Sequence, residues 1–181
     1  MGKSTAAAWL QDHGIPVVDT DELARQLVQP GEPALAEIQS AFGQTILGAD
    51  GQLRRDELAR LVFADEAARK KLEVILHPRI RERWLAQLAE WRAAGQAAAV
   101  VVIPLLFETK SESNFDQLIC VACSAATQRE RLLARGWPAD EISRRNAAQL
   151  PVEKKMALAH HVIWTEGGLD VMAAQLARII A

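Results

Sequence analysis

The chain has 181 residues, and its 21 basic and 23 acidic side chains give a formal net charge of −2. That length suits one globular domain with room for a small inserted lobe. The near balance of charge argues against a broadly cationic surface, so we expect no general nucleic-acid binder. No apolar run approaches the roughly 20 residues of a membrane span, and no signal region follows the amino terminus, which predicts a cytoplasmic protein.

The first third of the chain predicts short elements separated by clear stop signals. Good helix formers after residue 3 end at Gly14, a residue typical of the end of a helix. Val17 and Val18 follow Pro16, a place where a strand tolerates proline. We therefore expect a helix over 3–13, a strand over 15–18, a helix ending near 28, a turn at 30–33 and a helix towards 42.

Residues 54–95 carry apolar side chains at three- and four-residue spacing, which is typical of amphipathic helices. His77-Pro78 lies inside this stretch. Because proline disfavours helical geometry at the residue before it, we predict that the helix is interrupted there.

The second half of the chain alternates apolar strands with helices. The alanines and valines of 97–103 follow one another without alternation, as in a parallel strand covered on both faces. Further strands are predicted over 118–122 and 161–164, and helices over 125–135, 138–149 and 168–180. This order predicts an α/β domain with a mainly parallel sheet, whose ligands bind beyond the carboxyl ends of the strands, at 19–21, 104–108 and after Trp164.

Cys120 and Cys123 are the only cysteines, in a C-x-x-C spacing. Their apolar neighbours indicate a buried strand in which cysteine packs as a small hydrophobe. The alternatives are redox chemistry or a zinc site, and zinc would need further ligands, for which His160-His161 is the only candidate cluster. Two cysteines without a secretion signal are consistent with a reducing cytosol.

Gly2-Lys3-Ser4-Thr5, at the start of the first predicted helix, matches the end of the motif G-x-x-x-x-G-K-S/T. In such a motif the backbone N–H groups bind phosphates, the lysine reaches the β- and γ-phosphates and the hydroxyl residue binds Mg²⁺. The first glycine, the spacer and a preceding strand are absent from this sequence. The alternative for these four residues is a solvated amino terminus.

Several segments resemble, in the same order, those of the dephospho-coenzyme A kinase family, over nearly the whole chain. They are Ile15 to Arg25, Pro30-Gly31, Leu76-His77-Pro78 with Arg81, Pro104-Leu105-Leu106-Phe107-Glu108, and the stretches 128–135 and 147–151. The resemblance implies a single domain with a P-loop NTPase-type parallel sheet flanked by helices, a helical coenzyme A-binding region at about 30–95 and a lid at about 136–152. It also implies ATP-dependent phosphorylation of the ribose 3′-hydroxyl of dephospho-coenzyme A, with Mg²⁺.

The resemblance also implies roles for individual residues. Asp21 would be the general base beside the acceptor hydroxyl, while Asp19 with Glu22 fits a helix-capping pattern instead. Lys3 would be catalytic together with Asp21. The other implied roles are ATP binding by Gly2, Lys3, Ser4, Thr5, Arg135 and Arg145, metal binding by Ser4, and substrate or lid contacts by His77, Arg81, Glu108 and Gln149. Arg131 could reach the same phosphates as Arg135, one helical turn away.

Three departures from the family pattern leave other functions open. The first strand and most of the phosphate loop are missing, so we expect the protein to start upstream. Val102 stands where an acidic residue is frequent, and Thr165 replaces an asparagine associated with adenine recognition. The alternatives are a non-catalytic relative that binds coenzyme A or a protein, and a P-loop kinase for another small acceptor such as a nucleoside monophosphate.

Overall fold

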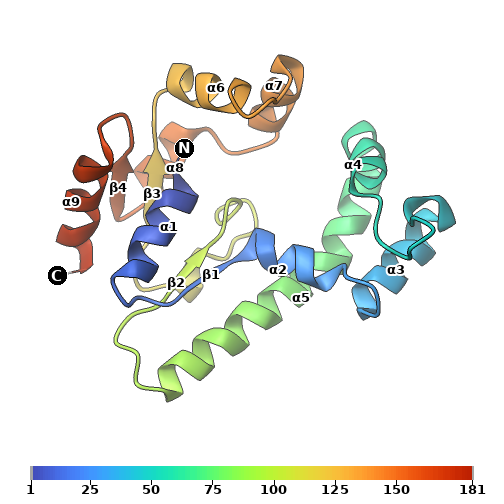
Figure 1. The fold of residues 1–181 in the computed structure, drawn as a ribbon, viewed down its shortest axis with the longest axis horizontal. Coiled ribbons are helices and arrows are strands. Elements are labelled where there is room, and N and C mark those ends of the chain that lie inside the picture. The colour runs from blue at the N-terminus through green and yellow to red at the C-terminus, as the bar shows by residue number, and fades with distance from the viewer. Residues whose placement is uncertain (1, 181) are drawn as a thin grey trace. The chain divides into compact units, whose positions relative to one another are not determined.

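The computed structural model describes residues 2–180, which divide into two compact units (Figure 1). Unit 1 contains the residues up to Ile15 and those from Ile103 onward, and unit 2 contains Pro16–Val102. In the described residues the strands form two two-stranded sheets, one in each unit. Both sheets are parallel, which confirms the predicted α/β class with parallel strand pairing.

Unit 2 places a helical region between two paired strands. Val17 lies opposite Val100 and Asp19 lies opposite Val102 in the parallel ladder. Since parallel strands need a long connection, the helices between them close this pair. In chain order the elements are β1 (Val17–Asp19), α2 (Thr20–Leu27), α3 (Pro33–Phe42), a 3₁₀ turn (Gln44–Ile46), α4 (Arg55–Ala64), α5 (Glu66–Ala93) and β2 (Val100–Val102).

The core of unit 2 combines buried residues of 27–46 with Leu58 and Ile75 from the apolar stripe predicted over 54–95. Ile38 and Ile46 are completely buried. On the surface, Arg79 pairs with Glu37 and Arg83 with Glu32, which adds links between α5 and the α3 region. The other buried members of the cluster are Leu27, Val28, Ala34, Leu35, Leu58 and Ile75.

The predicted interruption at His77-Pro78 is wrong, because α5 runs from Glu66 to Ala93 with Pro78 inside it. The helical region breaks at Asp65 instead, whose side chain accepts a hydrogen bond from the Ala67 N–H at 2.9 Å and so begins α5. Pro78 has no N–H for the carbonyl of Val74, a residue that is 74% exposed. Apolar packing by Ile75, on the turn before the proline, helps to hold the helix across the defect.

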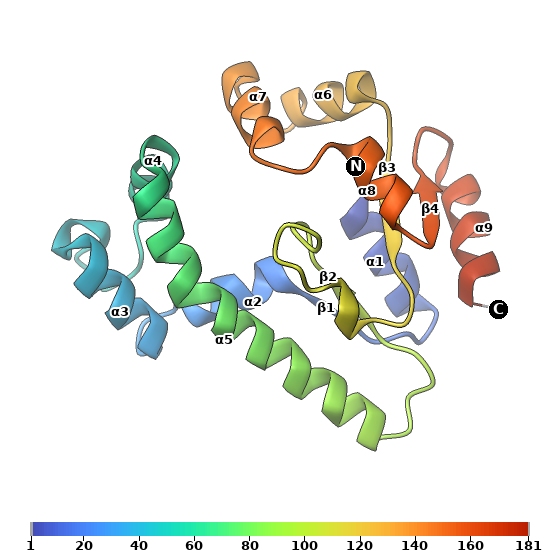
Figure 2. The ribbon, with the colours of Figure 1, turned by 180° about the vertical axis from the view of Figure 1, so that it is seen from behind.

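Unit 1 packs helices on its own parallel pair of strands, with α9 lying against both β4 and α1 (Figure 2). The predicted last strand matches β4 at both ends, and the predicted helices over 125–135, 138–149 and 168–180 match α6, α7 and α9 within two residues. The short helix α8 was not predicted. The elements are α1 (Lys3–Asp12), a 3₁₀ turn (Glu112–Asn114), β3 (Ile119–Ala122), α6 (Ala125–Leu133), α7 (Ala139–Ala147), α8 (Val152–Leu158), β4 (His161–Trp164) and α9 (Leu169–Ile180).

The strand predicted over 97–103 is shorter and less covered than expected. It contains only Val100–Val102, and all three residues are partly buried rather than buried. A two-stranded ladder bonds a strand along one edge only, so fewer residues are held in extended geometry.

The predicted buried strand around the cysteines is found only in part. Cys123 is buried directly after β3, whereas Cys120, on β3, and most of that strand are only partly buried. Burial raises the pKa of the Cys120 thiol, and the charges of Lys155 and Lys3 oppose that rise only in part. Among residues 2–180 no group of three or more metal-binding side chains is found, and none of the described helices is long and apolar enough to cross a membrane.

Replacing Pro78 with alanine should stabilise unit 2 by about 1–2 kcal/mol, because an N–H becomes available to the Val74 carbonyl. The gain is smaller than the roughly 3 kcal/mol cost of an interior proline, since the substitution also loosens the unfolded chain. Urea unfolding measures the change. Pro33→Ala is the control, since Pro33 is the first residue of α3 and breaks no helical hydrogen bond. A lower free energy of unfolding for Pro78→Ala would contradict the account of α5.

Candidate active site

Asp21 lies in the first turn of α2, directly after the carboxyl end of β1. Asp19 has extended backbone geometry and accepts a hydrogen bond from the Asp21 N–H at 2.8 Å, so it caps the helix as predicted. Glu22 pairs with Arg25 at 2.9 Å, and this contact takes the place of the predicted capping-box bond. The capping role is therefore carried by Asp19, and the carboxylate of Asp21 is exposed.

Thr20 is a positioning residue that the sequence did not reveal. It is only 7% exposed, and its hydroxyl donates to the Val102 carbonyl at 3.0 Å. This bond ties the first turn of α2, next to Asp21, to the end of β2. A hydroxyl residue directly after a strand end was the only signal, and its partner lies 82 residues away.

The amino end of α1 has the backbone geometry of an anion site. Gly2 has a φ of 84°, in the left-handed region that favours glycine, and α1 begins at Lys3. A Cβ at Gly2 would lie 3.1 Å from Thr165 Cγ2, so glycine is required there sterically as well. No side chain of the described residues caps α1, so the N–H groups of its first turn, where Ser4 and Thr5 lie, favour an anion.

Arg131 lies against the same segment that Gly2 approaches. Its guanidinium donates to the Thr165 carbonyl at 2.6 Å and to the Thr165 hydroxyl at 3.0 Å. The Thr165 hydroxyl in turn donates to the Ala122 carbonyl at 3.1 Å. Thr165 therefore joins α6, β3 and the start of α1, and Arg131 brings positive charge to that place.

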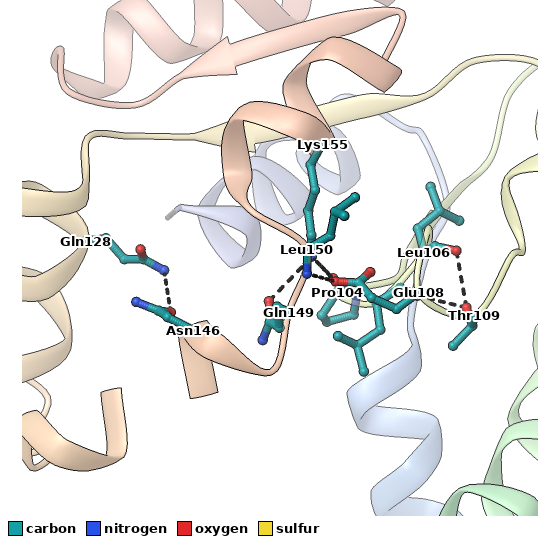
Figure 3. A network of polar contacts seen from close by, with 10 residues as sticks. Pro104, Leu106, Glu108, Thr109, Gln128, Asn146, Gln149, Leu150 and Lys155 are labelled. Carbon is teal, nitrogen blue, oxygen red and sulfur yellow. Dashed lines mark hydrogen bonds and ion pairs between the residues drawn. The ribbon is translucent and has the colours of Figure 1, made fainter. Parts of the chain in front are cut away.

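Glu108 and Gln149 come together around a lysine that was not predicted to matter (Figure 3). The ammonium of Lys155, on α8, lies 2.8 Å from Glu108 Oε1 and donates to Gln149 Oε1 at 3.4 Å. Glu108 Oε1 also accepts the Leu150 N–H at 2.9 Å. Burial acts to raise the pKa of Glu108, but the hydrogen bonds from Lys155 and Leu150 outweigh it and lower that pKa.

Arg145 and Arg135 differ in their surroundings. Arg145, on α7, donates to Glu141 at 2.9 and 2.6 Å, and its guanidinium carbon lies 4.2 Å from the centre of the Trp137 ring. Arg135, beyond the end of α6, is exposed and pairs with no acidic side chain of the described chain. Gln128 of α6 bonds Asn146 of α7 at 3.4 Å, which links the two helices (Figure 3).

The predicted site residues are divided between the two units. Asp21, His77 and Arg81 belong to unit 2, where His77 and Arg81 are exposed and one turn apart on α5. Unit 1 carries the rest, namely Gly2, Lys3, Ser4, Thr5, Glu108, Arg135, Arg145 and Gln149.

A parallel α/β fold whose first helix opens with Gly-Lys-Ser-Thr is consistent with a P-loop NTPase-type fold. A family model described as dephospho-CoA kinase matches residues 1–170. The chain belongs to the dephospho-CoA kinase family.

Similar proteins support this assignment, and solved structures share the fold. The chain is 44% identical to a dephospho-CoA kinase of Anaeromyxobacter dehalogenans, over 99% of this chain and 86% of that protein. It is 42% identical to one from Bdellovibrio bacteriovorus, over 90% and 81%. A crystal structure from Thermus thermophilus superposes with a TM-score of 0.83 at 32% identity, over 99% and 90%. Dephospho-CoA kinase from Campylobacter jejuni shares the fold, with a TM-score of 0.72 at 23% identity over the same shares.

Glu166 stabilises the loop after β4 through its charge. Its carboxylate accepts hydrogen bonds from the Ser124 N–H at 2.9 Å, the Thr127 hydroxyl at 2.8 Å and the Trp164 ring N–H at 3.2 Å. The bonds from Ser124 and Thr127 lower the pKa of Glu166 from 4.5 to about 2. A lowered pKa means that this stabilisation is present above pH 4.5 and is lost as the pH falls towards about 2.

Glu166→Gln should therefore be less stable than the wild type at neutral pH. The difference should shrink as the pH falls from 4.5 towards about 2, because the wild-type carboxyl then takes up its proton. Urea unfolding at several pH values measures it. Asp116→Asn, at an exposed carboxylate with no hydrogen bond within the described chain, should show no such trend. A constant difference at every pH would mean that charge is not the cause.

Proposed function

We propose that this chain transfers the γ-phosphoryl group of ATP to the ribose 3′-hydroxyl of dephospho-coenzyme A, giving coenzyme A and ADP. Family membership over nearly the whole chain supports the reaction. The observation that carries the mechanism is the exposed carboxylate of Asp21, in the helical turn at the carboxyl end of a parallel strand.

In the proposed mechanism Asp21 is the general base. Its carboxylate accepts the proton of the 3′-hydroxyl as the new oxygen–phosphorus bond forms and the bond to ADP breaks. The hydrogen bond from Thr20 to the Val102 carbonyl holds the turn in place during this step. Phosphoryl transfer depends on positioning and charge stabilisation, so the main requirement beside the acceptor hydroxyl is a carboxylate held in a fixed position.

The nucleotide phosphates would lie at the amino end of α1. Backbone N–H groups of the first turn and the ammonium of Lys3 would balance the β- and γ-phosphate charge, with Thr5 beside them. Mg²⁺ supplies charge neutralisation when bound. Proteins usually bind Mg²⁺ through one or two side chains, with waters and phosphate oxygens as the other ligands. The exposed hydroxyl of Ser4 would therefore suit it as a protein ligand, although Val102 replaces the acidic residue that is frequent in the family.

Arg145 and Arg135 would bind the phosphates from the lid side, at residues 136–152 and just before them. In the structure Glu141 occupies two donors of Arg145, as phosphate oxygens could. When ATP binds, a phosphate group would replace the Glu141 carboxylate as the partner of the Arg145 guanidinium. The guanidinium would remain stacked on the Trp137 ring.

The acceptor would be bound by the helical region at about 30–95. His77 and Arg81 face the same side of α5, and Arg81 would pair with the phosphates of dephospho-coenzyme A. Glu108 and Gln149 would set the lid against the acceptor. The free thiols of Cys120 and Cys123 support a cytoplasmic location.

ADP release with Mg-ATP and dephospho-coenzyme A tests the proposal. Two proteins are compared: the chain as printed, and a chain in which a strand, the first glycine and the four spacer residues of the motif precede Gly2, so that Gly2-Lys3-Ser4 completes the loop. Turnover in either supports the proposed reaction. If both proteins fold and neither shows turnover, a non-catalytic relative is favoured. Turnover with a nucleoside monophosphate but not with dephospho-coenzyme A would favour a P-loop kinase for another small acceptor.

Asp21→Asn should lower kcat by about 10²- to 10⁴-fold, the range of general-base catalysis, because the amide cannot take the proton. The dissociation constant of ATP should stay within about two-fold, since Asp21 acts on the acceptor. Glu22→Gln is the matched control, one residue along the same exposed turn and paired only with Arg25. Equal kcat for Asp21→Asn and the wild type would remove Asp21 from the mechanism.

A further inference from the structure

We propose that Lys155 is a positioning residue for this reaction: its ammonium anchors the carboxyl end of the lid to the turn that carries Glu108. The role rests on the proposed function and on a lid at residues 136–152. Lys155 lies just beyond the lid, on α8, and its side chain is only 11% exposed.

Three oxygens surround the ammonium of Lys155. They are Glu108 Oε1 at 2.8 Å, the Pro104 carbonyl at 3.0 Å and Gln149 Oε1 at 3.4 Å. An ammonium group has three donors, so these contacts use all of them. Lys155 therefore has no donor left for a substrate, and it acts through the residues it holds.

Glu108 is the link between Lys155 and the lid. Its Oε1 accepts both the ammonium of Lys155 and the Leu150 N–H at 2.9 Å. The turn is closed from within by the Thr109 hydroxyl, which donates to the Leu105 carbonyl at 2.8 Å and to the Leu106 carbonyl at 3.3 Å (Figure 3). The carboxylate thus sits on a rigid turn, and Lys155 keeps it directed at Leu150.

Removing the charge of Lys155 would free the end of the lid. The Glu108 side chain is 21% exposed, so without its partner the carboxylate gains by turning to water and releases the Leu150 N–H. Leu150 directly follows Gln149. Arg145 lies on α7, the helix that ends just before Gln149. Lys155 thereby sets the position of two residues proposed to contact substrates, and a shift of about 1 Å there can cost about 10²-fold in rate.

Lys155→Met keeps the apolar stem of the side chain and removes its charge. We expect kcat to fall by about 10²-fold, with the fold retained. Amide hydrogen exchange at Leu150 should be at least about ten-fold faster, while the amides of β3 keep their protection. Lys154→Met is the matched control, because Lys154 is the exposed neighbour on α8 and pairs with no acidic side chain of the described residues.

Lys155→Arg, which retains the charge, should recover part of the Leu150 protection. If Lys155→Met does not fold, Glu108→Gln removes the other partner and should give the same two changes. Wild-type exchange at Leu150 in either folded variant overturns the proposal, whatever happens to kcat. If the wild type itself has no kinase activity, the proposed function fails, and the exchange at Leu150 still decides whether Lys155 is an anchor.

Discussion

A helix begins with backbone N–H groups that no earlier turn can bond, and these groups favour an anion where no side chain caps them. Side chains satisfy those groups at α2 through Asp19, at α5 through Asp65 and at α6 through Ser124 with Glu166. Among the described residues no side chain caps α3, α4, α7 or α8. The first turns of α4, α7 and α8 contain acidic residues, which repel an anion, and α3 begins with a proline directly after Glu32. The start of α1 also has no side-chain cap among the described residues, and it differs from α3 in carrying Lys3.

The same rule explains why the proposed base and the proposed phosphate site use different helix starts. At α2 the cap comes from within the chain: Asp19 accepts the Asp21 N–H, and Asp21 itself is exposed. At α1 the first turn is opened by a glycine in the left-handed region, which lets the backbone approach a ligand closely. In the proposed mechanism, one helix start would supply a base and the other would supply donors for phosphate charge.

Buried polar groups hold these helix starts and the lid in position. Thr20 reaches across to Val102, Arg131 and Thr165 bond each other, and Lys155 joins Pro104, Glu108 and Gln149. In each case a buried donor has an acceptor, as the cost of an unpaired buried polar group requires. Several of these residues touch no proposed substrate, yet they determine the geometry of those that do.

Sequence alone was sufficient for features that depend on near neighbours. The strand 161–164, most helix boundaries and the Asp19 cap follow from local apolar patterns and from side chains one turn away. The Gly-Lys-Ser-Thr start and the order of the family segments identified the class of enzyme before any contact was known.

Only the tertiary structure decided features whose partners lie far away in the chain. Pro78 stays helical because packing in unit 2 outweighs a local cost that pattern reasoning treats as a break. Val102, the partner of Thr20, lies 82 residues away, and Pro104, one partner of Lys155, lies 51 residues away, so no spacing in the sequence could reveal these contacts. Local propensity reports which helices and strands form, whereas the pairing of a buried hydroxyl or ammonium depends on which oxygens the finished fold brings within reach.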